Sequence, residues 1–332
     1  MHPKQLLDRY HIEPKKSLGQ NFLHDEGLLG RIVAAADLSP DDEVLEVGPG
    51  LGALTRVLAR AARRVVAVEL DGRLLPVLES ELSELVNVEL VHGDVLQLDP
   101  ADWFAAPYVV VANVPYYITG AILRHLLGGR PRPRRLVLTV QREVADRLTA
   151  RPPEMSLLAV SVQYYGRARL VSTVKAGAFW PRPEVDSAVV RIDVDERFLE
   201  QDDGSPTVDH RPPTAAKPAV SDASRAVGAL GDEREADLPP TARHSPPIPS
   251  AVGGRRSAVE AEAAFFRVVR AGFSEKRKQL KNNLRGLGLD DGAIAAALAE
   301  AGIDGRRRAE TLTVGEWEEL TQAIATASSA RA

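Results

Sequence analysis

The sequence predicts a doubly wound α/β sheet followed by a small C-terminal all-helical domain. Short runs rich in β-branched residues alternate with helical patterns through the first half of the chain, as they do in βαβ units. The runs 65–68 and 109–111 are continuously apolar, which is typical of parallel strands buried on both faces. Beyond residue 257 only helical patterns are found.

The elements of the sheet are expected in a simple order. Five parallel strands are predicted at 43–47, 65–69, 88–91, 108–112 and 135–141. A helix over 53–62 follows the first strand, and the runs 168–174 and 187–194 predict a closing pair of strands near the edge of the sheet. The sheet domain is therefore expected over 1–194.

Residues 195–260 interrupt this pattern. They include nine prolines and only ten Leu, Ile, Val or Phe among 66 residues, or about 15%, whereas segments below roughly 20% seldom fold alone. We therefore predict a low-complexity, disordered insertion over 195–256.

The helical domain is expected over 257–332. Ser257 with Glu260, and Thr313 with Glu316, have the spacing of capping boxes at helix starts. Helical patterns run on through residue 284, from 291 to 301, and after residue 313.

Composition excludes several classes of protein. The 332 residues, 44% of them apolar, are ample for a packed core, and the absence of cysteine excludes a disulfide scaffold, a thiolate zinc site and a cysteine nucleophile. The absence of cysteine also fits a reducing compartment, so we expect a cytoplasmic protein. No apolar stretch reaches 18 residues, so no membrane segment is expected. His92 and His125 are isolated, and no metal site is expected.

The net charge of −4 hides an uneven distribution. Residues 35–102 hold 14 Asp or Glu against five Arg, whereas 124–151 hold eight Arg against two acidic residues, and 265–285 hold seven Lys or Arg against one. Basic patches beside an acidic half favour a polyanionic partner, although solvated helix faces explain the charges equally well.

A glycine-rich loop, residues 48–52, lies between the first strand and its helix. Glycines allow a sharp turn and the close approach of a ligand. Gly48, Gly50 and Ala53 satisfy the dinucleotide fingerprint, and Glu69 ends the next strand, where a carboxylate can bind ribose hydroxyls. These residues leave NAD and S-adenosylmethionine equally open, with a structural tight turn as a third interpretation.

Two motifs farther along favour S-adenosylmethionine. Asp94 follows the third strand, where it can accept from an adenine amino group or, alternatively, cap a turn. Asn113-Val114-Pro115-Tyr116 follows the fourth strand and resembles the Asn/Asp-Pro-Pro-Tyr motif of methyltransferases that act on amino groups of nucleobases. A hydride-transfer enzyme does not need this tetrapeptide.

The residue types of this tetrapeptide suit methylation of an adenine amine, whose lone pair is delocalised into the ring. If Asn113 Oδ1 and the carbonyl of Val114 or Pro115 accept its two N–H bonds, the nitrogen can pyramidalise toward a methyl donor. Tyr116 can stack on a flipped base. A helix start explains Pro115 alone, but not Asn113 and Tyr116 together. We therefore predict Asn113, Pro115 and Tyr116 as catalytic residues.

The chain resembles the ribosomal RNA adenine N6-dimethyltransferase family, most closely its bacterial small-subunit (16S) branch, over about 12–194 and 257–322. The motifs that carry the resemblance are residues 17–23, the glycine-rich loop, Glu69, Asp94, residues 113–116, 179–187 and 273–284. The resemblance implies a Rossmann-like methyltransferase sheet with S-adenosyl-L-methionine as cofactor.

The resemblance also implies which residues hold that cofactor. Asn21 and Leu23 would close over it, and Gly48 would lie against its methionine part. Glu69 would bind the ribose and Asp94 the adenine. Asn113 would contact both the cofactor and the target amine.

The resemblance implies a helical RNA-binding domain. We expect a basic helix to supply the phosphate contacts, through Arg267, Arg270, Lys276, Arg277, Lys278 and Lys281. The implied reaction is transfer of methyl groups to N6 of two adjacent adenines in a hairpin loop of 16S ribosomal RNA, with the immature small ribosomal subunit as partner and the protein as a monomer. Two alternatives remain open: a large-subunit methyltransferase that confers macrolide resistance, and a ribosome assembly factor with secondary catalysis.

Overall fold

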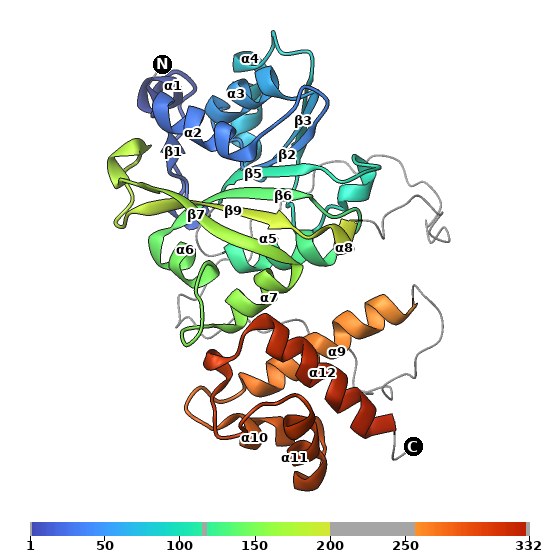
Figure 1. Ribbon diagram of the computed structural model, residues 1–332. Coiled ribbons are helices and arrows are strands. Elements are labelled where there is room, and N and C mark those ends of the chain that lie inside the picture. The colour runs from blue at the N-terminus through green and yellow to red at the C-terminus, as the bar shows by residue number, and fades with distance from the viewer. Residues whose placement is uncertain (1, 115–117, 200–255, 330–332) are drawn as a thin grey trace.

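The computed structural model describes residues 2–114, 118–199 and 256–329 (Figure 1). Pro115 and Tyr116, two of the predicted catalytic residues, lie outside the described residues, as does most of the predicted insertion. The elements of the sheet half are α1 Pro3–Arg9, β1 Phe22–Leu23, α2 Glu26–Ala36, β2 Glu43–Val47, α3 Ala53–Ala61, β3 Arg64–Glu69, α4 Leu75–Glu81, β4 Val88–His92, β5 Val109–Asn113, α5 Thr119–Gly128, β6 Arg135–Gln141, α6 Arg142–Leu148, α7 Leu157–Tyr165, β7 Gly166–Val174, β8 Phe179–Trp180, β9 Ser187–Val194 and α8 Glu196–Leu199. The helices that follow are α9 Arg256–Gly272, α10 Leu280–Asn283, α11 Asp291–Glu300 and α12 Val314–Ser329.

A seven-stranded sheet forms the centre of the first half, in the order β4-β3-β2-β5-β6-β9-β7. The first five strands of this order are parallel, and β9 and β7 close the edge in antiparallel fashion. The prediction of a doubly wound sheet with a closing pair is therefore confirmed, and each predicted parallel strand lies within one residue of the observed one. Strand order reverses between β2 and β5, which is where open α/β sheets bind ligands.

Helices cover both faces of this sheet (Figure 1). On one face α2 and α3 pack against strand residues such as Val65 and Val111, and on the other α5, α6 and α7 pack against Val110 and Leu138. These strand residues are fully buried, which explains why the strands read as continuous apolar runs. A separate cluster joins α1 to α4 through Leu7 and Leu78.

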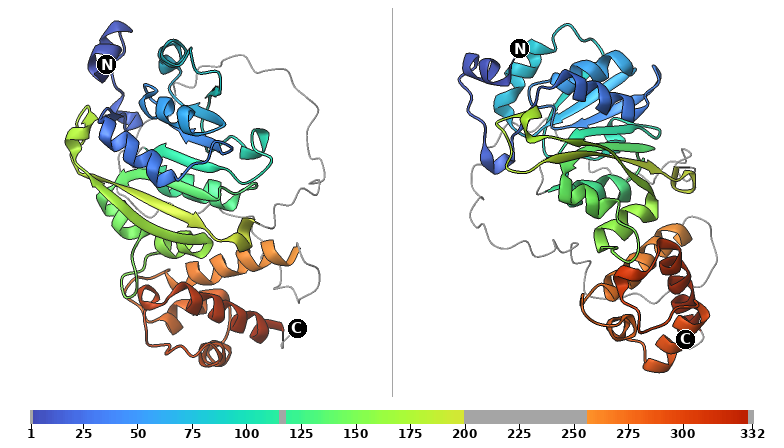
Figure 2. Two further views of the ribbon diagram at one scale, coloured as in Figure 1. Left: turned by 45° about the horizontal axis from the view of Figure 1, so that its top comes forward. Right: turned by 60° about the vertical axis from the view of Figure 1, so that its left-hand side comes forward.

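The C-terminal helices form a second body that rests on α7 (Figure 2). At the junction, the rings of Tyr164 and Phe265 stack with their centroids 4.0 Å apart. Arg132, only 1% exposed, donates to Glu262 Oε2 at 2.7 Å, and the Tyr165 hydroxyl donates to Glu262 Oε1 at 2.6 Å. Removing one partner of a buried ion pair leaves an uncompensated charge and strongly destabilises the fold. This pair therefore holds the C-terminal helices against the sheet half.

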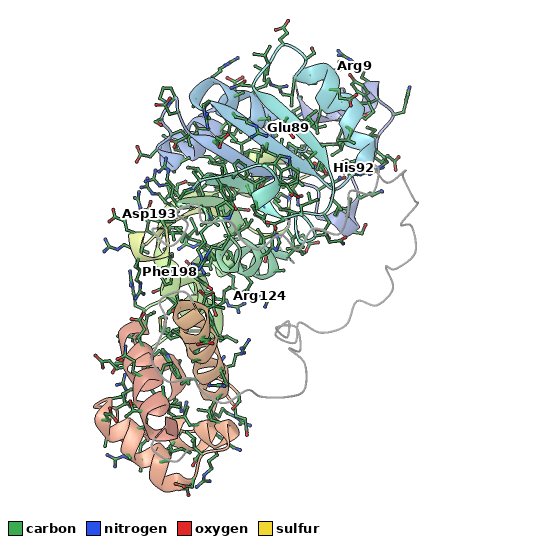
Figure 3. All side chains as sticks on the ribbon, turned by 90° about the vertical axis from the view of Figure 1, so that its right-hand side faces the viewer. Arg9, Glu89, His92, Arg124, Asp193 and Phe198 are labelled. Atoms are coloured by element: carbon green, nitrogen blue, oxygen red, sulfur yellow. The ribbon has the colours of Figure 1, made fainter. Side chains whose placement is uncertain are left out.

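The first residues of the predicted insertion are folded, which corrects its boundary at 195. Residues 196–199 form α8, and Phe198 is 7% exposed. Its ring lies 5.2 Å from the rings of both Tyr164 and Tyr165, near the start of α9 (Figure 3). Two adjacent apolar residues, Phe198 and Leu199, between charged neighbours give no periodic signal, so the sequence pattern did not indicate this helix.

The predicted basic helix is not continuous. The helix α9 ends at Gly272, and a turn over 273–279 precedes α10. A Cβ at Gly272 would clash with the Trp317 ring, so the absence of a side chain lets α12 approach closely. Asn283 then donates to the carbonyl oxygens of Gly272 and Glu275, which satisfies the helix end.

One of the two predicted capping boxes is present. The Thr313 N–H donates to Glu316 Oε2 at 2.7 Å, and the Glu316 N–H donates to Thr313 Oγ1 at 3.1 Å, at the start of α12. Ser257 instead lies inside α9, which already includes Arg256.

Candidate active site

A cavity opens at the carboxyl ends of β2, β3 and β5, where the strand order reverses. Its volume is about 1090 Å³ including adjoining solvent, large enough for a nucleoside-sized ligand. The lining residues come from the N-terminal segment, the glycine-rich loop and the ends of four strands. They include Asn21, Leu23, Gly48, Glu69, Asp94 and Asn113, the six residues predicted to bind the cofactor.

The glycine-rich loop has left-handed backbone at three positions. Gly48, Gly50 and Gly52 have φ of 72°, 60° and 75°, which residues with a side chain rarely adopt. A Cβ at Gly50 would also lie 3.0 Å from the ring of Phe22. The loop therefore needs glycine both for its turn and for close packing against the N-terminal segment.

Glu69 lies at the end of β3 and is 6% exposed. Its Oε2 accepts from the Gly50 N–H at 3.1 Å, and its Oε1 accepts from the Asp71 N–H at 2.8 Å. Each carboxylate oxygen keeps a second lone pair that can accept from a hydroxyl group of a ligand. Burial raises the pKa of Glu69 to about 7, although these backbone hydrogen bonds favour the ionised form.

Glu46 is a site residue to which the sequence pattern assigned no role. It is 1% exposed on β2 and lines the cavity, and its Oε2 has no hydrogen-bond partner within the described part of the chain. Burial raises the pKa of Glu46 to about 8, and the charge of Glu69 adds to the rise. An acidic residue between the apolar residues Leu45 and Val47 of a strand is the signal that could have marked it.

Asp94 follows β4, where its side chain accepts hydrogen bonds within a turn and also lines the cavity. Its Oδ1 accepts from the Leu96 N–H at 3.0 Å, and its Oδ2 accepts from Gln97 Nε2 at 3.3 Å. Asp94 therefore caps a turn, which is one of the two roles expected from the sequence. Because Asp94 also lines the cavity, both roles are compatible.

Asn113 ends β5 beside the glycine-rich loop. Its Nδ2 donates to the carbonyl oxygen of Asn21 at 3.0 Å, which turns Oδ1 away from that carbonyl. Asn21 itself donates from Nδ2 to the Gly19 carbonyl at 3.1 Å. Leu23, two residues farther on, pairs with Phe179 in the small β1–β8 sheet, which brings together two of the sequence motifs.

The predicted RNA-binding residues lie on the helical body and outside the cavity. Lys276 and Arg277 are exposed in the turn before α10, and none of the described residues forms an ion pair with either. Lys278 differs, since it pairs with Glu275 at 2.6 Å. The remaining members lie on α9 (Arg267 and Arg270) and α10 (Lys281).

The residues around the cavity fit an S-adenosyl nucleoside. Glu69 and Asp94 offer carboxylate oxygens at the ends of neighbouring strands, for hydroxyl and amino donors respectively. Glu46 Oε2 is a buried acceptor that lacks a donor among the described residues. Gly48 leaves open space, since a Cβ there would have its nearest neighbour, the Asn113 carbonyl oxygen, 3.8 Å away.

Residues 2–114, 118–199 and 256–329 contain neither a candidate metal site nor a candidate membrane span. No group of three or more His, Asp or Glu side chains there could hold a metal ion. No helix in the same ranges is long and apolar enough to cross a membrane. His125 instead bonds the Leu98 carbonyl through Nε2 at 2.9 Å.

Comparison with known proteins identifies relatives of this chain. Residues 12–205 match the family model described as ribosomal RNA adenine dimethylase. The chain is 39% identical to ribosomal RNA small subunit methyltransferase A of Dehalococcoides mccartyi (strain CBDB1), over 96% of this chain and 90% of that protein. It is 40% identical to the protein of the same name from Geobacillus thermodenitrificans, over 97% and 94%.

Solved structures resemble the fold. The 23S rRNA methyltransferase ErmE superposes with a TM-score of 0.61 at 26% identity, over 92% of this chain and 99% of that one. A dimethyladenosine transferase from Plasmodium falciparum superposes with a TM-score of 0.64 at 20% identity, over 90% and 95%. The second likeness bears on the fold alone.

Proposed function

The chain belongs to the ribosomal RNA adenine dimethylase family, and we propose that it transfers methyl groups from S-adenosyl-L-methionine to N6 of two adjacent adenines in a hairpin loop of 16S ribosomal RNA. The product of the two transfers at each adenine is N6,N6-dimethyladenine. The observation that carries the proposal is the convergence of Glu69, Asp94 and Asn113 in one cavity, from three strand ends.

We assign the cofactor to this cavity. Glu69 would accept hydrogen bonds from the ribose hydroxyls, Asp94 from the adenine amino group, and Glu46 from a donor of the methionine part. Asn21 and Leu23 would cover the cofactor from the N-terminal side. When bound, the cofactor supplies an electrophilic methyl group on a sulfonium.

Asn113 would prepare the target amine. Its Nδ2 is already engaged with the Asn21 carbonyl, so Oδ1 is the atom that can accept from the adenine amino group. A second acceptor, the carbonyl of Val114 or Pro115, would hold the other N–H and let the nitrogen direct its lone pair at the methyl carbon. The methylated nitrogen is acidic and releases its proton afterwards, so no strong base is needed before transfer. Tyr116 would stack on the flipped base.

The small-subunit substrate is favoured over the large-subunit one. Relatives that are 39–40% identical over nearly the whole chain are named for the small subunit, whereas the 23S methyltransferase is 26% identical. A purely non-catalytic assembly factor would not require an asparagine amide held in this orientation at the cavity. We expect the protein to act on immature small subunits as a monomer in the cytoplasm.

The helical body would bind the RNA backbone. Lysine and arginine side chains that lack an acidic partner are free to neutralise phosphates, and Lys276 and Arg277 meet this condition among the described residues. The other candidates are Arg267, Arg270, Lys278 and Lys281. A target in a loop can be read as single-stranded RNA with its bases splayed out.

Incubation with labelled cofactor tests the substrate. The protein is mixed with small or large ribosomal subunits that lack adenine methylation, and the RNA is then digested to nucleosides. The proposal predicts labelled N6,N6-dimethyladenosine from 16S RNA only. Label confined to 23S RNA would support the large-subunit alternative, and no label in either RNA would refute the proposed activity.

A further inference from the structure

Asp71 is a buried carboxylate that does not line the cavity but contacts two residues that do, Glu69 and Gln20. It is 4% exposed and follows Glu69 by two positions. Its own N–H donates to Glu69 Oε1 at 2.8 Å, so its backbone orients the carboxylate assigned to the ribose. Its side chain points to a different segment of the chain, the strap, which we define as residues 13–23.

Three polar groups of the strap meet Asp71 or its partner Arg73. Gln20 Nε2 donates to Asp71 Oδ2 at 2.9 Å, and Lys15 Nζ lies 3.8 Å from Oδ1. Arg73 forms a two-pronged pair with Asp71, at 2.9 Å from Nε and 2.6 Å from Nη2, and donates from Nη1 to the Glu13 carbonyl at 3.3 Å. Charge-assisted hydrogen bonds of this kind are about twice as strong as neutral ones.

The charge of Asp71 is stabilised where it lies. Burial alone would raise the pKa of this carboxyl, but hydrogen bonds from Arg73 and Gln20 outweigh burial and hold the pKa below its ordinary value. The carboxylate therefore stays ionised at neutral pH and keeps all its acceptor positions.

The strap also reaches the opposite side of the cavity. Gln20 immediately precedes Asn21, whose carbonyl accepts from Asn113 Nδ2 at 3.0 Å. Phe22 packs against Gly50 in the glycine-rich loop, and strap residues 18–23 all line the cavity. Movement of the strap at Gln20 would thus displace both the cover of the cavity and the group that orients Asn113.

We propose that Asp71 is a positioning residue that holds the strap closed over the cofactor through Gln20 and thereby sets the orientation of Asn113. This inference rests on the proposed function and extends it, since Asp71 does not line the cavity and acts through Gln20 and Asn21. In the free protein Asp71 holds the strap in place, and in the loaded protein it slows cofactor release.

The substitution Gln20→Met tests this link, because it keeps the length of the side chain and removes its polar atoms. These are the Nε2 donor to Asp71 and the Oε1 acceptor of the Lys15 N–H at 2.7 Å, a bond that lies within the strap. Stopped-flow measurement of S-adenosylhomocysteine release should give a rate about tenfold above wild type, the size expected for loss of a bond to a charged group. Hydrogen exchange of strap amides should also quicken in the free protein, with little change in the midpoint of thermal unfolding. Lys4→Met, an exposed change on α1, serves as the control and should leave both measurements at wild-type values.

A double-mutant cycle with Asp71→Asn separates a shared contact from two independent effects. If both residues act through one hydrogen bond, the double variant should release the ligand no more than about twofold faster than the faster single variant. Independent, multiplying effects, or wild-type release and exchange in Gln20→Met, would overturn the inference. If wild-type protein binds no S-adenosylhomocysteine, the proposed function is wrong, and the exchange measurement alone then decides whether Asp71 holds the strap.

Discussion

Asn113 donates from its side-chain amide to the main-chain carbonyl of Asn21, 92 residues earlier in the sequence, at 3.0 Å. This bond fixes which atom of the Asn113 amide faces the cavity. The nitrogen is held by the strap, so in the proposed function the oxygen is the atom that would accept from an adenine amine.

Replacing Asn113 should therefore reduce methyl transfer far more than RNA binding. Loss of one preorganised polar group at a transition state typically costs about 10²–10³-fold in kcat, which is what we expect for Asn113→Ala. Asn113→Asp keeps an acceptor but loses the donor to the Asn21 carbonyl, so its activity should lie between alanine and wild type. Single-turnover transfer and RNA binding measured on the same samples check this, and wild-type turnover by the alanine variant would contradict the role.

The raised pKa of Glu69 predicts pH-dependent cofactor binding. An ionised carboxylate accepts hydrogen bonds from ribose hydroxyls more strongly than a protonated one does, and burial raises the pKa of Glu69 to about 7 in the free protein. Affinity for S-adenosylhomocysteine should thus fall as the pH is lowered from 8 to 6, approaching about tenfold per unit below 7. Glu69→Gln should bind at least about tenfold more weakly at pH 8 and show a shallower pH dependence, because Glu46 still titrates in the cavity over this range. Calorimetry at three pH values measures both effects, and a flat wild-type profile would count against the assignment.

The raised pKa of Glu46 predicts that the free energy of unfolding changes with pH. Burial raises its pKa from the ordinary 4.5 to about 8, so between these values the folded state keeps a proton that the unfolded state has released. The free energy of unfolding should therefore decrease as the pH rises through this window, by up to about 1.4 kcal/mol per unit from this group.

The substitution Glu46→Gln removes this titration while keeping the shape of the side chain. The variant should gain stability relative to wild type as the pH rises from 6 to 8.5, measured by urea unfolding. Glu84→Gln, at an exposed position, should keep the wild-type slope. An identical slope in the Glu46 variant would show that this carboxyl does not hold the proton.

We expect Lys276 and Arg277, exposed in the turn before α10, to make a salt-dependent contact with RNA. Replacing both Lys276 and Arg277 with Gln should weaken RNA binding about tenfold at 0.1 M salt and reduce the slope of log affinity against log salt by about 1.4, or 0.7 per charge. Arg306→Gln is a matched control, because its charge is paired with Asp304 at 2.9 Å. Equal salt slopes in the double variant and wild type would remove this turn from the interface.

Much of this architecture could be predicted from the sequence because it depends on local patterns. Apolar runs give the strands, and the topology of parallel strands brings their carboxyl ends to one edge, so Gly48, Glu69 and Asn113 were expected to lie together. The strand order and the cavity agree with that expectation. The family resemblance added Asn21 and Leu23, which local patterns alone would have left as a turn.

The features that could not be predicted are single long-range contacts. The bond between Gln20 and Asp71 and the ion pair between Arg132 and Glu262 leave no periodic trace in the sequence. At the break after Gly272, the Asn283 side chain donates to the carbonyl oxygens of Gly272 and Glu275, and this contact between separate elements leaves no periodic trace either.

The most direct test is a structure of the protein with S-adenosylhomocysteine and an adenine-containing 16S hairpin. We expect the adenine N6 within about 3 Å of Asn113 Oδ1, with the ribose hydroxyls of the cofactor on Glu69. An N6 atom beyond hydrogen-bonding reach of Asn113, or a nucleoside with its ribose away from Glu69, would contradict it.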